Sequence, residues 1–92
     1  MTKKELTTKV FSIIAEKLLE SNETYISIHT YVNDGGIDLK FEYTSEEEAE
    51  LINEMKLACR DQGIWFDSDF MTQEPIMNWN LDWSLEEIKE EA

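Results

Sequence analysis

The tetrapeptide Asn33-Asp34-Gly35-Gly36 separates two stretches in which apolar and polar residues alternate. The apolar positions of this alternation are Ile26, Ile28 and Val32 before it, and Ile37, Leu39, Phe41 and Tyr43 after it. A period of two is the pattern of a half-buried strand. The Asp-Gly-Gly sequence allows positive φ, which tight hairpin turns favour. Residues 25–43 are therefore predicted to form a β-hairpin.

Helical periodicity brackets this hairpin. Residues 4–20 place apolar side chains at the 3.6-residue spacing of a helix that buries one face, namely at Leu6, Val10, Ile13, Ile14 and Leu18. After the hairpin, Ser45 and Glu48 fit a capping box, in which each side chain satisfies a backbone donor of the other's residue. A second helix is predicted from there to Gln62-Gly63, where glycine suits a left-handed cap. Its apolar face carries Leu51, Ile52, Met55, Ala58 and Cys59.

The last third of the chain returns to alternation. Around residues 64–71 and 77–83 the alternating apolar residues are Ile64, Phe66 and Phe70, and then Met77, Trp79, Leu81 and Trp83. Each stretch predicts a strand. Ser84 and Glu87 form another capping box, which predicts a short C-terminal helix docked through Leu85 and Ile88. The expected fold is α+β in the order αββαββα, with an antiparallel sheet of about four strands packed against helices.

Size and composition limit the organisation further. A chain of 92 residues has room for one domain, residues 1–92, and its 41% hydrophobic content is enough for a core. The single Cys59 cannot form an internal disulfide and lacks the companions of a zinc site. No apolar run has the length of a signal peptide or a membrane span, so we expect a soluble protein of the cytoplasm.

The net charge of −13 is unevenly distributed along the chain. Residues 1–40 hold 6 acidic and 5 basic residues, whereas residues 41–92 hold 15 acidic and 3 basic residues. Such a charge argues against direct binding to nucleic acid or to an anionic membrane. The expected partner is a basic protein.

Several of these acidic residues form rows. Glu46, Glu50 and Glu54 follow one ridge of the second predicted helix about 6 Å apart, with Glu47 beside them. Asp67 and Asp69 share one face of a predicted strand, about 6.7 Å apart. No Lys or Arg occurs in residues 41–55 or 61–88. The rows therefore lack basic neighbours in the sequence.

Two interpretations of the rows are open. Runs of charge are commonly a solvated surface. However, like charges about 6 Å apart repel by roughly 0.7 kcal/mol even in water, and solubility needs a net charge of only about 2 to 8. We therefore favour a function for the field itself: anions gathered on one common patch and spaced like phosphates, which a cationic cleft accepts in place of DNA.

The sequence contains few residues that could form a catalytic site or a metal site. His29 is the only histidine and is expected to be partly exposed, while Cys59 lies on an apolar helix face. Asp67-Ser68-Asp69 opens like a calcium loop, but Met71 stands where the next oxygen ligand belongs. Asp38 and Lys40 are only a weak trace of a nuclease motif. We expect no enzyme activity, no cofactor and no metal site.

A different class of function rests on apolar anchors. Trp79 and Trp83 fall in phase with the apolar residues of their strand and are expected in the core, whereas Trp65 falls opposite Phe66. Exposed Trp65, together with Met71, would form a homodimer seam or an anchor for a partner. The alternative function is accordingly an acidic adaptor or assembly protein, whose carboxylates serve solubility.

The chain has a family likeness in its length, in its overall acidity and in two acidic segments. These segments are Ser45-Glu46-Glu47-Glu48-Ala49-Glu50 and Phe66-Asp67-Ser68-Asp69-Phe70. It resembles the small anti-restriction proteins of T-even bacteriophages that imitate DNA. That resemblance implies that the protein acts in the host cytoplasm, binding and inhibiting the modification-dependent restriction enzyme McrBC. It assigns the partner-binding acidic surface to Glu46, Glu47, Glu50, Glu54, Asp67, Asp69, Asp82, Glu86 and Glu87.

Overall fold

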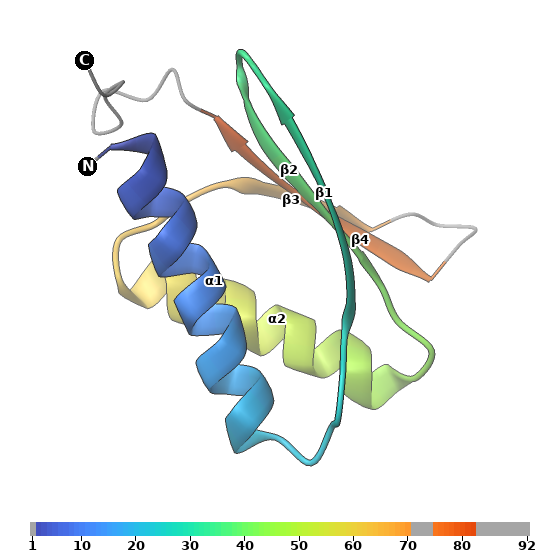
Figure 1. Ribbon diagram of the computed structural model, residues 1–92. Helices are drawn as coiled ribbons and strands as arrows, with labels where there is room; N and C mark the ends of the chain where they lie inside the picture. The colour runs from blue at the N-terminus through green and yellow to red at the C-terminus, as the bar shows by residue number, and fades with distance from the viewer. Residues whose placement is uncertain (1, 71–74, 83–92) are drawn as a thin grey trace.

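The computed structural model describes residues 2–70 and 75–82 and shows an α+β domain of two layers (Figure 1). Its elements follow the order α1, β1, β2, α2, β3, β4. Their bounds are Lys3–Glu20 for α1, Ser27–Asn33 for β1, Gly36–Glu42 for β2, Glu46–Asp61 for α2, Asp67–Phe70 for β3 and Ile76–Asp82 for β4. The α+β class and the antiparallel four-stranded sheet are as the sequence predicts.

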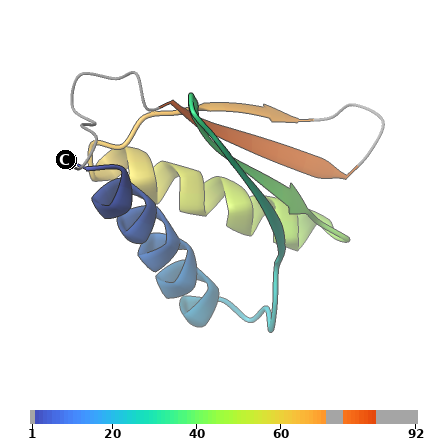
Figure 2. The same cartoon turned by 45° about the horizontal axis from the view of Figure 1, so that its top comes forward.

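The sheet is antiparallel throughout, with the strand order β1-β2-β4-β3. Strands β2 and β4 are thus central, and β1 and β3 are the two edges. Both helices lie on the same side of the sheet, which leaves its other side without a covering element in the described chain (Figure 2). We call that side the open face.

The core lies between the helices and the covered side of the sheet. Trp79 is fully buried, with its ring centroid 4.4 Å from that of Phe41 and 4.7 Å from that of Phe66. Around these aromatic rings are the apolar faces of the helices and the alternate residues of the central strands. They include Leu6, Val10, Ile13, Ile14, Ile37, Leu39, Leu51, Ile52, Met55, Cys59, Met77 and Leu81. The predicted core positions of Trp79 and Cys59 are confirmed.

Local chemistry explains where the second helix begins and ends. The Ser45 hydroxyl accepts a hydrogen bond from the backbone N–H of Glu48 at 3.2 Å, as in a capping box. At the other end, Gly63 has a φ of 82°, a conformation that favours glycine. The backbone N–H of Ile64 donates back to the Cys59 carbonyl at 3.0 Å. Because Ile64 is hydrogen-bonded to the end of α2, strand β3 begins at Asp67 rather than at residue 64.

The hairpin is confirmed, but the reason given for its glycines is wrong. Neither Gly35 nor Gly36 has a positive φ, and the turn is held instead by the Asn33 side chain, which accepts a hydrogen bond from the Gly35 N–H at 2.8 Å. Gly36 is needed for a different purpose. A Cβ atom there would stand 2.0 Å from the backbone oxygen of Leu81, so glycine allows β2 to approach β4.

Some expectations fall outside the described residues: the C-terminal helix, the core position of Trp83, and Met71, Glu86 and Glu87. Within the part that is described, neither helix has the length and apolar character needed to cross a membrane.

The contrast between the two hairpin glycines gives a test. We expect Gly36→Ala to lower the free energy of unfolding by about 3 kcal/mol, because the added methyl group collides with the β4 backbone. Gly35→Ala is the matched control: its Cβ has no neighbour closer than 3.4 Å, so the change should stay within about 0.5 kcal/mol. Urea unfolding of both variants measures the difference. Equal stability of the two would contradict the close approach of β2 to β4.

Candidate functional site: two acidic surfaces

The first acidic surface runs along α2 and is called here the helix ridge. It consists of Glu46, Glu47, Glu50 and Glu54, all of which are exposed. The side of α2 that carries Leu51, Ile52, Met55 and Cys59 is buried in the core. At 100° per residue the ridge lies on the opposite side of the helix, and it therefore points away from the sheet. The sequence prediction of a carboxylate row on α2 agrees with this placement.

The second acidic surface belongs to the open face and is called here the sheet array. Its members are Asp38, Glu42, Asp67, Asp69 and Asp82. Register places Asp38 and Asp67 directly opposite Asn80 on either side, which makes one row across three strands. A second row joins Lys40, Asn78 and Asp69 in the same way. Because residues directly opposite share a face, and because Met77, Trp79 and Leu81 point to the core, both rows point outward.

At the hairpin end of the open face the sheet array lines a hollow of about 220 Å³. Asp38, Asp67 and Asp82 contribute to its walls, together with the amide-bearing Asn33 and Asn80. Three strands, β2, β3 and β4, therefore bring carboxylates to one concavity. Asp38 and Glu42 were not among the residues expected to contact a partner. Their alternation with Ile37, Leu39 and Phe41 was the signal that places them on this face.

The expectation that all these carboxylates share one patch is not met. The helix ridge lies on the side of α2 opposite its buried residues, whereas register places Asp67, Asp69 and Asp82 on the open face of the sheet. Figure 2 shows α2 on the other side of that sheet. The cause is the two-layer architecture itself, because α2 and β3 present opposite sides to the same core. The structure brings the ridge residues together and brings the sheet residues together, but it separates the two sets.

Few of these carboxylates have a basic partner. Among the described residues, Lys17 forms an ion pair with Glu20 at 3.4 Å, and the Nε2 atom of His29 lies 3.4 Å from a carboxylate oxygen of Glu42. In the described chain no Lys or Arg forms an ion pair with a helix-ridge residue or with Asp67 or Asp69. The nearby Lys56 of α2 instead donates to the Ser68 hydroxyl at 3.2 Å. Within residues 2–70 and 75–82, the lack of basic partners expected for the ridge residues and for Asp67 and Asp69 therefore extends to three dimensions.

Glu48 differs from the ridge residues although it lies among them in the sequence. Its side chain is buried, and its Oε2 atom accepts hydrogen bonds from the Thr44 hydroxyl, from the Thr44 backbone N–H at 3.0 Å and from the Ser45 hydroxyl at 3.3 Å. The hydrogen bond from the Thr44 hydroxyl, followed by that from the Thr44 N–H, lowers the pKa of Glu48 below its ordinary value of 4.5. Glu48 is thus a structural carboxylate that holds the start of α2.

The lowered pKa has a definite effect on stability. We expect Glu48→Gln to reduce the free energy of unfolding by about 1 kcal/mol at neutral pH, because charge-assisted hydrogen bonds become neutral ones. A carboxylate with a lowered pKa in the folded state contributes its stabilisation above the unfolded value of 4.5 and loses it as the pH falls through the folded value. The gap between wild type and variant should therefore narrow below pH 4.5.

Chemical unfolding at a series of pH values measures that gap. Glu47→Gln is the control, since Glu47 is an exposed neighbour on the same helical turn, and it should change stability by no more than about 0.5 kcal/mol. A gap for Glu48→Gln that stays constant from pH 7 to pH 3 would refute the assigned role of this carboxylate.

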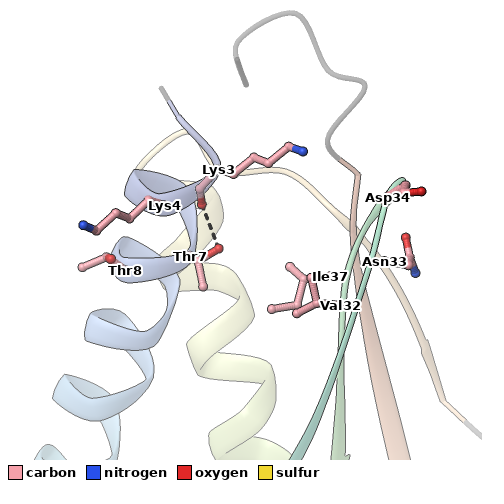
Figure 3. Close-up of a pocket in the computed structure, with 8 residues that line it drawn as sticks. All are labelled: Lys3, Lys4, Thr7, Thr8, Val32, Asn33, Asp34 and Ile37. Atoms are coloured by element: carbon pink, nitrogen blue, oxygen red, sulfur yellow. Dashed lines mark hydrogen bonds between the residues drawn. The ribbon is translucent and has the colours of Figure 1, made fainter. Parts of the chain in front are cut away.

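Two of the five basic residues in residues 1–40, Lys3 and Lys4, lie at the start of α1. A hollow of about 500 Å³ lies between the first turns of α1 and the hairpin, lined in part by Lys3, Lys4, Val32 and Ile37. Figure 3 shows Lys3 extending towards the hairpin and Lys4 extending away from it, with the Thr7 hydroxyl donating to the Lys3 carbonyl at 2.8 Å. These lysines mark the start of α1 and do not neutralise the helix ridge.

The surroundings of Cys59 and His29, the residues considered for catalysis, are those of residues with a structural role. Cys59 is fully buried, and this burial raises the pKa of its thiol to about 11, so the thiol stays protonated at neutral pH. His29 is exposed on β1, as expected, and lies next to Glu42. Among residues 2–70 and 75–82, no group of three His, Cys, Asp or Glu side chains is placed to hold a metal ion.

Trp65 is exposed, as its position opposite Phe66 predicts, with 65% of its surface accessible. The Arg60 guanidinium lies over its ring, 5.2 Å from the centroid, which is cation–π geometry. Both residues line a hollow of about 330 Å³ that also includes Asp67, Asn80 and Asp82. The candidate anchor therefore adjoins the sheet array. Its expected companion, Met71, lies outside the described residues.

No known family model matches this sequence, and no curated protein matches it at a significant level.

Proposed function

We propose that this protein is a DNA mimic, which binds the nucleic-acid site of a basic protein and blocks the entry of DNA without catalysing a reaction. The observation that carries the proposal is the helix ridge: exposed carboxylates about 6 Å apart along one line, with no ion pair to a basic residue in the described chain. A lattice of unneutralised anions is what a DNA-binding cleft recognises non-specifically.

The sequence predicts a single patch, and the proposal instead uses two acidic surfaces on opposite sides of the domain. The phosphate backbones of a duplex lie on opposite sides of a thin rod. The helix ridge and the sheet array likewise lie on opposite sides of a thin, two-layered domain. A cleft whose basic walls close around DNA would meet anions on both walls when it closes around this protein.

The proposed partner rests on the resemblance of the sequence to the anti-restriction proteins of T-even phages, such as Arn. On that basis the target is a host defence protein, namely the restriction enzyme McrBC, and the protein acts in the host cytoplasm to protect phage DNA. The acidic charge of the whole chain favours rapid, electrostatically steered association with such a basic target.

Charge reversal tests the proposal. We expect Glu50→Lys with Glu54→Lys to weaken inhibition of DNA binding by McrBC at least tenfold, while leaving the fold intact and slightly more stable because ridge repulsion is relieved. The matched control is Glu16→Lys with Glu20→Lys on α1, which makes the same change in net charge at the same helical spacing outside both acidic surfaces. Full inhibition by the ridge variant would remove the ridge from the interface.

Asp67→Lys with Asp69→Lys tests the second surface separately. If both surfaces contact the cleft, this variant should also lose inhibition, whereas one active surface would leave one of the two variants unaffected. A loss that is equal for the ridge variant and for the α1 control would show that only the net charge matters.

Salt dependence distinguishes mimicry from apolar docking. Binding to the target should weaken steeply between about 50 and 200 mM salt and should be competed by duplex DNA. The affinity is measured by titration at several salt concentrations, with and without an excess of duplex. Binding that is indifferent to both salt and DNA would contradict mimicry.

The second candidate function is an acidic adaptor that binds a partner through an apolar anchor. The exposure of Trp65 beside Arg60 favours it, because tryptophan and arginine are enriched among the residues that dominate interfaces. In that case Trp65→Ala should abolish binding to the partner, and the ridge variant should bind like wild type. A pull-down from host lysate with both variants, with and without DNA, compares the two functions directly.

A further inference from the structure

Two of the hollows described above adjoin each other at the hairpin end of the sheet. The hollow of about 220 Å³ and the hollow of about 330 Å³ share Asp67, Asn80 and Asp82 in their walls. They are therefore adjacent parts of one groove across β2, β4 and β3, called here the Trp65 groove. Trp65 lies at one end of this groove, and Asp38 lies at the other.

The side chain of Trp65 reaches the groove because burial alternates along the chain after α2. Ile64 and Phe66 are buried, whereas Trp65 and Asp67 are exposed. Alternate residues of an extended segment point the same way, so the indole ring and the Asp67 carboxylate lie on one side of the chain. An aromatic ring and a carboxylate consequently line the same groove.

Trp65 already contacts one guanidinium group, that of Arg60. The Cζ atom of Arg60 lies 5.2 Å from the ring centroid, which is cation–π geometry. The Nε atom of Arg60 is buried, so packing holds this guanidinium in place. Because 65% of the surface of Trp65 nevertheless stays accessible, much of the ring remains open to a partner.

The charge of the groove selects the sign of its occupant. Asp38, Asp67 and Asp82 line it together with a single basic residue, Arg60, which leaves a formal excess of two negative charges. Phosphate and other anions are repelled by such a lining. An apolar side chain would desolvate Asp67, which forms no ion pair with Lys or Arg in the described chain, without pairing it. A cation satisfies both the ring and the carboxylate.

We infer that the Trp65 groove is the docking site for an arginine side chain of the basic partner. The guanidinium lies over the open part of the Trp65 ring and donates hydrogen bonds to the Asp67 carboxylate. Arginine is selected over lysine because its guanidinium is planar, stacks on aromatic rings and matches a carboxylate with two parallel donors. The side chain of Asn80, which is opposite Asp67 in register, offers an amide oxygen to a remaining donor.

This inference deepens the proposed function and rests on it for the source of the arginine. A cleft that binds DNA presents arginine side chains to the phosphates. When such a cleft closes on this protein, the groove gives one of those side chains an aromatic contact that a phosphate does not offer.

Titration of the full chain with acetyl-arginine amide tests the site without the partner. Two-dimensional NMR resolves the indole N–H signals of the three tryptophans, and we expect the Trp65 signal to shift on binding. Acetyl-lysine amide has the same charge and should bind about threefold more weakly, because its ammonium group is compact and strongly hydrated. A Trp65 signal that does not move, or equal binding of the two probes, would overturn the inference.

Substitutions place the bound guanidinium within the groove. Asp67→Asn keeps the shape of the side chain and should weaken binding of the arginine probe about threefold, since the charge-assisted hydrogen bonds are lost. Asp69→Asn is the matched control, because it removes the same charge from the same face of β3 but lies outside the groove. Equal losses in the two variants would show attraction by net charge alone and would overturn the inference.

The aromatic contact has its own pair of variants, followed through the backbone amide signals of β3. Trp65→Leu should weaken binding of the arginine probe about threefold, and Trp65→Phe, which keeps an aromatic ring, should bind more tightly than Trp65→Leu. Circular dichroism checks the fold of each variant. If Trp65→Leu binds the probe as wild type does, the site is not at the ring.

Inhibition of DNA binding by the target separates this inference from the proposed function. Trp65→Leu and Asp67→Asn should each weaken inhibition about threefold, whereas Glu16→Gln on α1 makes the same charge change as Asp67→Asn and should inhibit like wild type. Full inhibition by both groove variants would overturn the inference and leave the proposed function standing. Probe binding at Trp65 by a protein that does not inhibit would support the arginine site and remove only the proposed function.

Discussion

The burial of Trp79 between Phe41 and Phe66 is the interaction on which the arrangement of this protein depends. Trp79 lies on a central strand, and its neighbours come from the adjacent central strand and from the segment after α2. Both helices pack on the side of the sheet that carries this aromatic cluster, because their apolar faces are buried against it. All the polar residues that alternate with it must then point to the other side, which is how the open face acquires its carboxylates.

The acidic surfaces are compatible with a stable fold because their carboxylates are at least partly exposed to water and lie outside the core. Each ridge carboxylate is exposed to water, where repulsion at about 6 Å amounts to only about 0.7 kcal/mol per pair. The one carboxylate of this region that is buried, Glu48, is satisfied by hydrogen bonds from Thr44 and Ser45. Exposed acids are therefore left without partners, and the buried acid has several, as the cost of desolvating a charge requires.

Much of the fold could be predicted from the sequence, because period and capping are local signals. The two helices, the hairpin, the buried Trp79 and Cys59 and the exposed Trp65 all follow from patterns within a few residues. Long-range relations could not be predicted in the same way. The strand order, which places β4 between β2 and β3, and the close approach at Gly36 depend on which strands become neighbours.

The candidate site shows the same limit. Periodicity grouped Glu46, Glu50 and Glu54 correctly, and likewise Asp67 with Asp69, since each group lies on one element. Whether a helix and a strand point the same way depends on how the layers stack, so the separation of the two groups was not visible in the sequence. The contribution of Asp38 to the hollow beside Asp67 also needed the register through Asn80.

In the described chain both helices cover the same side of the sheet, and this arrangement has an evolutionary consequence. The exposed carboxylates of the open face, such as Asp67 and Asp69, lie outside the hydrophobic core, so substitutions at these positions are expected to leave the fold unchanged. Selection can therefore change the pattern of carboxylates and amides, position by position, as the target protein changes. A lineage of such proteins would keep its buried aromatic residues while its outer surface diverged rapidly.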